Sequence, residues 1–352
     1  MRILHVIQEL DVGGAERIAV SLARGAHEAG HEVAVASRPG PLAREIPGPH
    51  FPLPLLERRP WRLPGAARSL DRAFRHWRPN LLHCHNPGMA AVASIATLRG
   101  RRLRALVSVH GVPEADWAAA ARVLRLSGLP AVACGPGVSA ALAEHGVEVH
   151  ATTVNGISAA PNAVDPRTFA SEFGLRSGQP VVLTVGRLVG AKNHALAIRA
   201  LAGVREAALV VVGEGPERET LAGLAEDVRV ADRVVLAGLR GDARSLMGGA
   251  DAIVLTSRAE GLPLAALEAL ASGTPLVAVA VRGLRELLED GKNAVLVPPD
   301  DPAALAEGLR RVLTERELAQ RIGAGGRLLA QQYTEERMVS SFLDLYVRLA
   351  AS

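Results

Sequence analysis

The sequence predicts an α/β protein with two doubly wound parallel sheets, and three observations support this. With 352 residues the chain exceeds the usual size of a single domain. Short β-branched runs alternate with Ala- and Leu-rich helical stretches from end to end, which is typical of parallel strands joined by crossover helices. Hydrophobic residues make up 49% and charged residues 22% of the chain, so each domain can bury a core.

The first half, residues 1–163, is expected to form one Rossmann-like domain. Its strands are predicted at 2–7, 32–36, 80–84 and 105–109, with helices at 15–29, 64–77 and 114–126 between them. The segment MRILHVIQEL lacks the apolar core of a signal peptide and is expected to be the first strand. Residues 126–143 carry no charge, but glycines and prolines interrupt them too often for a membrane span.

Residues 164–334 are expected to form a second Rossmann-like domain. Its predicted strands are VVLTV (181–185), ALVVV (208–212), RVVLA (233–237), AIVLT (252–256), PLVAV (275–279) and AVLV (294–297). The join lies near 155–180, where Asn, Gly and Pro residues break the periodic pattern. The last segment, 335–350, predicts an amphipathic helix whose apolar stripe packs back onto the first domain.

Charge and cysteine content limit the class of protein. Residues 1–165 hold 18 arginines and 13 acidic residues, whereas the remainder is nearly balanced. Either this excess has no function, or it attracts an anionic partner such as a phospholipid surface or a phosphorylated acceptor. No nucleic-acid partner is expected, because no recognised binding motif accompanies the charge. Two cysteines, Cys84 and Cys134, do not make a disulfide scaffold and fit a reducing cytosol.

The basic charge is densest in residues 57–79, which also contain Trp61. On a helix, Arg68, Arg72 and Arg75 would share one side and the apolar residues the other. The basic side either rests on an anionic membrane or is a solvated face. The protein is therefore expected in the cytoplasm, either free or peripheral at the inner face of the plasma membrane.

The most informative stretch is AIVLTSRAEGLPLAALEALASGTPLVAV, residues 252–279. A strand leads into a loop with Glu260 and Gly261, and a helix is expected to begin at Pro263, because proline suits the first helical position. The amides of residues 262–265 and the helix dipole then form an anion site for a diphosphate. Glu268 lies roughly 7.5 Å further along the axis, where its carboxylate can accept the hydroxyls of a ribose.

A second motif, VGRLVGAKNH, covers residues 185–194. Arg187 follows a predicted strand at its carboxyl edge, where open α/β sheets bind ligands. Lys192 is one of only two lysines in the chain, the other being Lys292. These two cations, five residues apart around a turn, can neutralise a leaving nucleotide diphosphate as a glycosidic bond breaks.

Both motifs resemble those of glycosyltransferase family 4, the retaining enzymes of the GT-B fold. Two glutamates eight residues apart around GLPLAAL, followed by ALASGTPLVA, resemble the family signature, and Arg187 with Lys192 resembles its Arg/Lys pair. The resemblance covers nearly the whole chain and is more specific in the second half. It implies two domains facing across a cleft and a nucleotide diphosphate sugar, such as a UDP- or GDP-sugar, as donor substrate without any cofactor.

The resemblance extends to residues of both domains. GGAER after the first strand resembles the glycine loop of the family, His110 ends a strand where members carry a histidine, and in LLHCHNPG the second histidine, His85, would line the cleft. The predicted catalytic residues are His110, Glu260, Arg187 and Lys192. The predicted donor-binding residues are Gly14, Gly186, Arg187, Lys192, Gly213, Leu239, Arg240, Glu260, Gly261, Leu262, Pro263, Leu264 and Glu268. The predicted acceptor-binding residues are Gly13, Gly14, Glu16 and His85.

No metal site is expected. His83 and His85 point to one face of a strand, but Cys84 between them faces the other side and no further ligand cluster follows. No Asp-x-Asp triplet occurs in the chain, so the two cations and the helix N-terminus would replace a metal clamp. The chain departs from the family at Arg282, where members have a small residue, and in PNAVD (161–165), where PNGVD is usual.

The predicted function is retaining, metal-independent, hexosyltransferase-like transfer of a sugar from a nucleotide diphosphate to a saccharide or lipid-linked acceptor. The product would belong to cell-envelope polysaccharide, lipopolysaccharide or glycolipid synthesis. Two alternatives stay open: a nucleotide-sugar 2-epimerase of the same fold and a catalytically silent nucleotide-binding scaffold. A nicotinamide oxidoreductase is disfavoured, since the glycine fingerprint and its downstream acid are missing.

Overall fold

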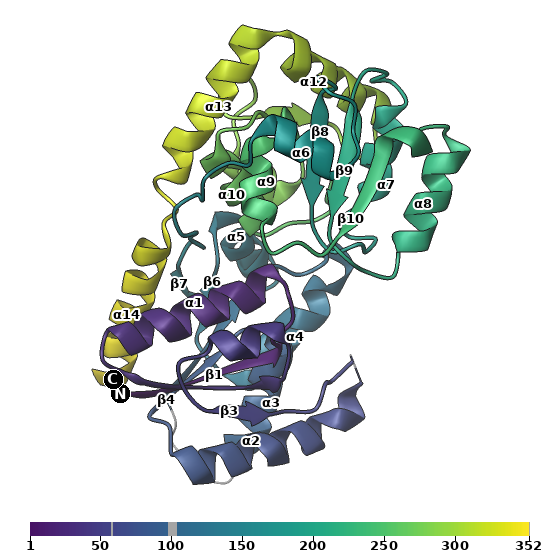
Figure 1. The fold of residues 1–352 in the computed structure, drawn as a ribbon. Helices are drawn as coiled ribbons and strands as arrows, with labels where there is room; N and C mark the ends of the chain where they lie inside the picture. The colour runs from purple at the N-terminus through teal and green to yellow at the C-terminus, as the bar shows by residue number, and fades with distance from the viewer. Residues whose placement is uncertain (58, 98–103, 352) are drawn as a thin grey trace. The chain divides into compact units, whose positions relative to one another are not determined.

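The computed structural model describes residues 1–57, 59–97 and 104–351. The chain forms two compact units, Met1–Gly156 with Glu335–Ser352, and Ile157–Thr334 (Figure 1). The boundary precedes the expected join at 163/164, because the intervening segment is held by the second unit. The Ile157 amide donates to the Tyr333 carbonyl, and the Val164 amide donates to the Ser245 carbonyl.

The first unit is a seven-stranded parallel sheet with strand order β3-β2-β1-β4-β5-β6-β7. The strands are β1 (Arg2–Glu9), β2 (Glu32–Arg38), β3 (His50–Pro52), β4 (Leu81–Cys84), β5 (Arg104–Val109), β6 (Ala131–Ala133) and β7 (Val149–Thr152). The helices are α1 (Gly14–Glu28), α2 (Leu63–Trp77), α3 (Pro87–Thr97), α4 (Trp117–Ser127) and α5 (Pro136–Glu144), with short 3₁₀ turns η1 (Pro41–Glu45), η2 (Pro60–Arg62) and η3 (Glu114–Asp116). The predicted helix at 114–126 thus begins with a 3₁₀ turn.

The second unit is a six-stranded parallel sheet with strand order β10-β9-β8-β11-β12-β13. The strands are β8 (Val181–Val185), β9 (Ala208–Val212), β10 (Val234–Gly238), β11 (Ala252–Leu255), β12 (Leu276–Val279) and β13 (Val295–Val297). The helices are α6 (Pro166–Glu172), α7 (His194–Leu201), α8 (Arg218–Asp227), α9 (Ala243–Gly249), α10 (Leu264–Ser272), α11 (Arg282–Leu287), α12 (Pro302–Thr314) and α13 (Arg316–Ala330), and η4 spans Ala231–Arg233.

Both sheets have a topological switch point, where the strand order reverses. It lies between β1 and β4 in the first unit and between β8 and β11 in the second. Open α/β sheets bind ligands at such points, outside the carboxyl ends of the strands. The predicted class, two Rossmann-like parallel-sheet units, is confirmed, and the loops after β1, β4, β8 and β11 are where a site is expected.

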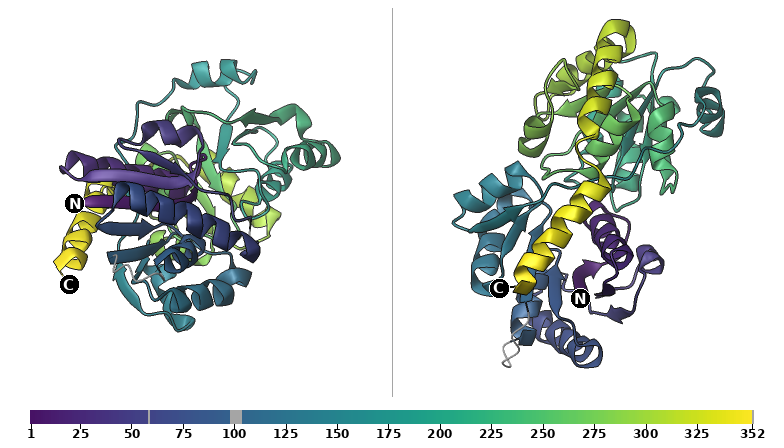
Figure 2. Two further views of the ribbon diagram at one scale, coloured as in Figure 1. Left: turned by 90° about the horizontal axis from the view of Figure 1, so that it is seen from below. Right: turned by 90° about the vertical axis from the view of Figure 1, so that its left-hand side faces the viewer.

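The last helix, α14 (Glu335–Ala351), packs beside α1 in the first unit (Figures 1 and 2). A side chain at Gly25 of α1 would place its Cβ 2.3 Å from Val339 Cγ1, so the glycine allows the two helices to approach. The predicted apolar stripe is buried through Met338, Phe342, Leu345 and Tyr346. The chain end therefore belongs to the core of the first unit.

Helix α2 has the two sides that its sequence predicts. Leu70, Ala73, Phe74 and Trp77 are buried, whereas the arginines at 68, 72 and 75 are exposed.

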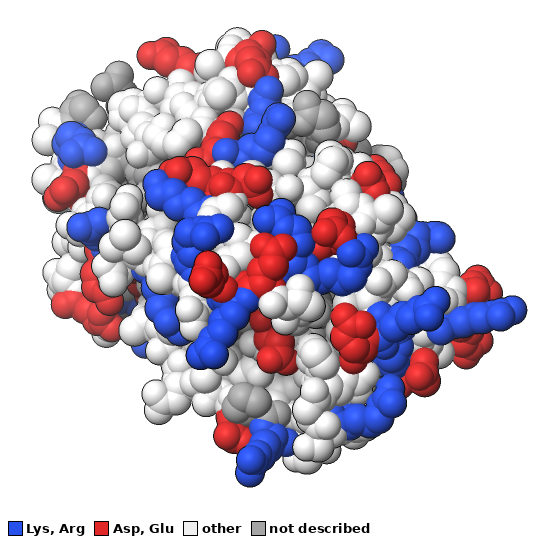
Figure 3. All heavy atoms as spheres, turned by 90° about the horizontal axis from the view of Figure 1, so that it is seen from above, with Lys and Arg blue, Asp and Glu red and all other residues white. Residues whose placement is uncertain are grey.

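On the face of the molecule seen in Figure 3, basic and acidic side chains are interleaved, so neither sign forms a continuous patch there. Among the helices of the described ranges, none combines the length and apolar character needed to cross a bilayer.

Candidate active site

The carboxyl ends of β8, β9 and β10 are joined by contacts that require glycine. The Gly186 amide donates to the Val212 carbonyl, and the Gly213 amide donates to the Gly238 carbonyl. Gly213 has φ of +150°, and a Cβ there would lie 1.8 Å from the Gly186 carbonyl oxygen. Since L side chains rarely adopt this conformation, both the space and the backbone require glycine at 213. The predicted residues Gly186 and Gly213 thus shape the edge of the sheet.

The loop after β8 is anchored to the loop after β11. Thr256 Oγ1 donates to the Lys192 carbonyl at 2.9 Å. Asn193 adopts the left-handed conformation, with φ of +51°, and its side-chain amide donates to Asp300 Oδ1 at 3.2 Å. On the amino side, the Arg258 amide donates to the Ala191 carbonyl at 2.9 Å, so the backbone is held on both sides of Lys192.

Lys192 and Glu260, two of the predicted catalytic residues, meet at this switch point. Lys192 Nζ lies 2.5 Å from Glu260 Oε1, and the two side chains are 27% and 13% exposed. A Cβ at Gly283, in the first turn of α11, would lie 1.9 Å from the Gly261 carbonyl oxygen, so α11 presses against this loop. Arg187 is exposed at the end of β8, and its carbonyl accepts a hydrogen bond from His194 Nε2 at 3.2 Å.

The helix after this loop begins one residue later than predicted. Pro263 is extended, with ψ of 129°, and serves as the N-cap of α10, which starts at Leu264. Proline has no amide hydrogen, so Pro263 adds no donor to the anion site expected from residues 262–265. The amides of Leu264 and Ala265, in the first turn, have no acceptor within the helix and can serve this site.

Glu268 is held by an arginine that the sequence motifs did not identify. Glu268 Oε1 lies 3.5 Å from Arg244 Nε, and the glutamate side chain is 15% exposed. Arg244, on α9, also donates to Ser158 Oγ at 2.8 Å and to the Ser158 and Ala159 carbonyls at 2.7 and 2.9 Å. Arg244 contacts residues far from it in the sequence, so no local sequence pattern predicts its pairing with Glu268.

The remaining predicted donor residues lie in the loop after β10. Leu239 is 55% exposed. The Arg240 guanidinium bonds both carboxylate oxygens of Asp242 at 2.8 and 2.7 Å and lies 2.5 Å from Glu172 Oε1. The Arg240 side chain is thus occupied within the unit, and the exposed surface of the loop is made by Leu239 and the backbone.

In the first unit, the glycine loop after β1 leads directly into α1. Gly13 is the N-cap of α1, and Glu16 lies in the first turn. A Cβ at Gly13 would lie 2.2 Å from Glu16 Oε2, because the glutamate folds back across the loop. Gly14, the first helical residue, is exposed. The predicted acceptor residues of this loop are therefore adjacent in space.

The two predicted histidines lie next to each other at the ends of neighbouring strands. His85 follows β4 and His110 follows β5, and His85 Nδ1 lies 3.4 Å from His110 Nε2. His85 is only 1% exposed, and its Nε2 lies 3.0 Å from Nδ1 of His5. The structure therefore places His85 beneath His110, with both ring nitrogens directed at other histidines and not at the surface.

The expectation that no further potential ligand accompanies His83 and His85 is wrong. His5 of β1 pairs opposite His83, and ring nitrogens of the three buried histidines lie within 4.8 Å of one another. Five of the six ring nitrogens face hydrogen-bond partners, including Tyr346 Oη and Ser108 Oγ, each 2.7 Å from His83. His5 was missed because strand pairing, which brings it here, is not visible in the local sequence.

Comparison with known proteins identifies the family. Residues 166–329 match the family model of glycosyl transferases group 1, and residues 12–168 match that of Glycosyltransferase Family 4. The chain belongs to glycosyltransferase family 4. The lipopolysaccharide core biosynthesis glycosyltransferase LpsD of Rhizobium meliloti is 29% identical to it, over 99% of this chain and 98% of the relative.

Solved structures place this glycosyltransferase in the GT-B fold class. Sucrose-phosphate synthase of Thermosynechococcus elongatus matches with a TM-score of 0.88 at 21% identity, over all of both chains. Anabaena Alr3699/HepE in complex with UDP-glucose matches with a TM-score of 0.86 at 20% identity, over 99% of this chain and all of the other. The comparison with solved structures thus also confirms the predicted fold class.

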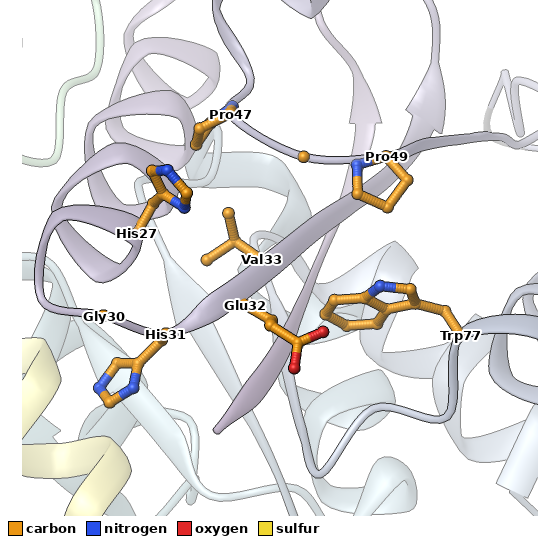
Figure 4. A pocket seen from close by; sticks show the side chains of 9 residues that line it. His27, Gly30, His31, Glu32, Val33, Pro47, Pro49 and Trp77 are labelled. Carbon is orange, nitrogen blue, oxygen red and sulfur yellow. The ribbon is translucent and has the colours of Figure 1, made fainter.

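The surface pocket of Figure 4 lies apart from the predicted site residues of the glycosyltransferase. Its lining includes His27 of α1, Glu32 at the amino end of β2, and Trp77 at the end of α2. Figure 4 shows His27 and Trp77 on opposite sides of the pocket with Glu32 between them. In a parallel sheet the amino ends lie at the edge opposite the carboxyl ends, so this pocket is remote from His110.

The buried histidines of the glycosyltransferase are neutral at pH 7. Burial lowers the pKa of His5 to about 3 and that of His110 to about 4. A hydrogen bond with the Asn155 side chain partly opposes the lowering of the His110 pKa. Burial lowers the pKa of His83 and His85 well below the ordinary value of 6.5. The network therefore carries no charge, which suits its position in the core.

We predict that the first unit of the glycosyltransferase loses stability steeply below pH 6.5. The unfolded chain protonates each of these histidines near its ordinary pKa of 6.5, whereas the folded state keeps them neutral. The stabilisation is therefore complete above pH 6.5 and is lost as the pH falls towards the lowered values. Each histidine contributes up to about 1.4 kcal/mol per pH unit to the free energy of unfolding.

Urea unfolding at about pH 7.5 and about pH 5 measures this dependence. All three tryptophans of the chain, Trp61, Trp77 and Trp117, lie in the first unit, so their fluorescence reports on that unit. His5→Leu should weaken the pH dependence, and replacement of the exposed His150 by Leu should leave it unchanged. An unfolding midpoint that does not move with pH would contradict the neutral network.

Proposed function

We propose that this glycosyltransferase transfers a sugar, with retention of configuration, from a nucleotide diphosphate sugar to an acceptor hydroxyl. The donor would bind outside β8 and β11. The observation that carries the proposal is the contact of Lys192 with Glu260 at that switch point, 2.5 Å apart. The Lys192 ammonium suits a phosphate and the Glu260 carboxylate suits a sugar hydroxyl. Both lie at the switch point, where sheets of this topology bind ligands. The related fold of Anabaena HepE with UDP-glucose supports the class of donor.

In this proposal the diphosphate takes the place of Glu260 as the partner of Lys192. Arg187, exposed at the neighbouring strand end, supplies the second positive charge. The amides of Leu264 and Ala265 with the α10 dipole add a smaller contribution. Glu260, released from the lysine, then accepts hydrogen bonds from the sugar hydroxyls.

The nucleoside would extend along α10 and the loop after β10. Glu268 would accept the ribose hydroxyls, with Arg244 holding its carboxylate in place. The backbone near Leu239 and Arg240 would face the base, because the arginine side chain is already bonded within the unit. A UDP- or GDP-sugar satisfies this arrangement equally.

The reaction would proceed on the leaving-group side of the sugar. The acceptor oxygen attacks the anomeric carbon as the bond to the β-phosphate breaks, and the departing phosphate oxygen takes the acceptor proton. Lys192 and Arg187 stabilise the charge that develops on the diphosphate, so the proposal requires no metal ion for this step. His110 would contact the sugar or its phosphate.

The acceptor side is proposed for the first unit, at Gly13, Gly14 and Glu16. LpsD is named for lipopolysaccharide core biosynthesis, which supports a saccharide or lipid-linked acceptor of the cell envelope. A 2-epimerase would convert its donor in the absence of any acceptor, and a silent scaffold would neither transfer nor slowly hydrolyse it. Product analysis of a purified donor with and without acceptor separates these alternatives.

We predict that Lys192→Ala weakens nucleotide binding, and the second lysine of the chain provides a matched control. Loss of one charge-assisted contact worth about 1.5–3 kcal/mol lowers affinity by about 10- to 100-fold. Lys292 is exposed and pairs with Glu289 away from the site, so Lys292→Ala removes the same charge without effect on binding. Isothermal titration calorimetry with UDP and with GDP measures both variants. Equal affinity of Lys192→Ala and wild type for whichever nucleotide binds would refute the donor site.

We also propose that the basic side of α2 rests on an anionic bilayer. Trp61, just before α2, is 72% exposed, and the Arg59 guanidinium carbon lies 5.9 Å from its ring centroid. An exposed tryptophan beside basic residues suits the membrane interface, where the ring enters the headgroup layer and the arginines face the phosphates.

We predict that the double variant Arg68→Glu/Arg72→Glu loses binding to anionic vesicles. Each basic residue near an anionic surface contributes about 1 kcal/mol, so two reversals lower the partition coefficient by at least about tenfold. The control Arg176→Glu/Arg199→Glu changes the net charge equally at exposed positions of the second unit. Sedimentation with phosphatidylglycerol-containing vesicles measures both. Equal loss in both variants would mean that net charge, and not α2, drives binding.

A further inference from the structure

A buried histidine lies against the loop that carries Arg187 and Lys192. His194 is the first residue of α7 and is 1% exposed. The second unit contains no other histidine. A Cβ at Gly186 would lie 3.5 Å from His194 Nε2 and 3.6 Å from Lys192 Cδ, so the ring and the lysine stem both reach the end of β8. The imidazole therefore adjoins the candidate donor site from inside the protein.

The partners of the two ring nitrogens fix the position of the proton on His194. Nε2 lies 3.2 Å from the Arg187 carbonyl oxygen, which can only accept a hydrogen bond. Nδ1 lies 3.4 Å from Thr184 Oγ1, which can donate as well as accept. A neutral ring carries one N–H and one acceptor nitrogen. The proton is therefore on Nε2, and Nδ1 accepts from the Thr184 hydroxyl.

The ring of His194 is neutral at pH 7. Burial lowers its pKa to about 4. Hydrogen bonds with the backbone of Arg187 and Gly186 partly oppose this lowering of the pKa, and the positive charge of Lys192 adds to it. His194 thus contributes a hydrogen-bond donor and no charge, so the positive charge of this loop is carried by Arg187 and Lys192 themselves.

The direction of the Arg187 side chain depends on its backbone. Among the described residues, the exposed Arg187 guanidinium has no ion-pair or hydrogen-bond partner, whereas Lys192 is paired with Glu260. The Arg187 carbonyl accepts two hydrogen bonds, from the Val189 amide at 2.9 Å and from His194 Nε2 at 3.2 Å. Because the peptide group is planar, two donors on this carbonyl restrict the rotation of the peptide that follows Arg187. They thereby restrict the direction in which the arginine side chain leaves the loop.

We propose that His194 is a positioning residue, whose Nε2–H holds the Arg187 carbonyl so that the Arg187 guanidinium is presented to the diphosphate of the donor. The inference rests on the proposed function in assigning Arg187 to the diphosphate. His194 is buried and is not itself a ligand of the substrate. It is therefore expected to act on nucleotide binding only through Arg187.

A double-mutant cycle between His194 and Arg187 tests this dependence. Isothermal titration calorimetry with UDP or GDP, whichever the wild type binds, measures the affinity of each variant. His194→Leu should lower the affinity by about 3- to 10-fold, which corresponds to the loss of one hydrogen bond. In the Arg187→Ala background the same substitution should have no further effect, because the side chain that His194 orients is gone. An equal loss of affinity in both backgrounds would overturn the proposal.

Two conservative variants separate the hydrogen bond to the Arg187 carbonyl from the packing of the ring. His194→Gln retains an amide donor for the carbonyl and should restore most of the affinity that His194→Leu loses. Thr184→Val is the matched control, because it removes the buried hydrogen bond to Nδ1 and leaves the one from Nε2. It should bind nucleotide like the wild type. A loss in Thr184→Val or in His194→Gln as large as that in His194→Leu would contradict the proposal.

If His194→Leu does not fold, the tautomer of the wild type still tests the inference. Long-range ¹H–¹⁵N correlation spectra of the ¹⁵N-histidine-labelled full chain report this tautomer, and comparison with His194→Gln assigns the signals of His194. We expect the proton on Nε2. A proton on Nδ1 would overturn the inference, because the ring could then not donate to the Arg187 carbonyl.

Failure of the proposed function would look different from failure of this inference. Either no nucleotide would bind to the wild type, or Arg187→Ala would bind it as tightly as the wild type does. In both cases the proton of His194 would still be found on Nε2.

Discussion

The ion pair between Lys192 and Glu260 joins the loops that leave the second sheet on either side of its switch point. Both side chains are largely removed from water, at 27% and 13% exposure. Removing one partner of such a pair leaves the other charge poorly solvated, so each charge needs another polar partner when the pair opens. In the proposed reaction a diphosphate would be that partner for Lys192, and sugar hydroxyls would be that partner for Glu260. The Lys192–Glu260 pair thus lies where the proposed reaction would place the diphosphate and the sugar.

Both units have a parallel sheet with a switch point, but the side chains near that point are charged in the second unit and neutral in the first. In the second unit, charged groups gather outside β8 and β11, held by glycine contacts at Gly213 and Gly283. In the first unit, the corresponding strands β1 and β4 carry neutral rings in the core, and the charge of the network is suppressed by burial. Low dielectric strengthens hydrogen bonds between such rings and raises the free-energy cost of leaving one unsatisfied. The first unit therefore keeps its buried histidines neutral, whereas the second unit gathers charged side chains at its strand ends.

Local sequence predicted the elements and the charged residues but not the contacts between distant segments. Strands β8 and β9 match their predicted ranges, because each is a short buried run with clear turns on both sides. The start of α10 was misplaced by one residue, since proline suits the N-cap as well as the first turn. His5 and Arg244 act through strand pairing and helix packing, so no motif contains them. The burial of His85 likewise follows from the register of β1, β4 and β5. This register cannot be predicted from the local sequence.

Hydrogen–deuterium exchange of the full chain with and without a nucleoside diphosphate tests the central claim most directly, because it locates the ligand as well as detecting it. With saturating UDP or GDP, protection is expected together in peptides from residues 186–193 and 257–266, the two loops that the Lys192–Glu260 pair joins. Peptides around His27 and Trp77 should not change. Protection at that pocket instead, or no protection of either loop by a nucleotide that binds, would contradict the account.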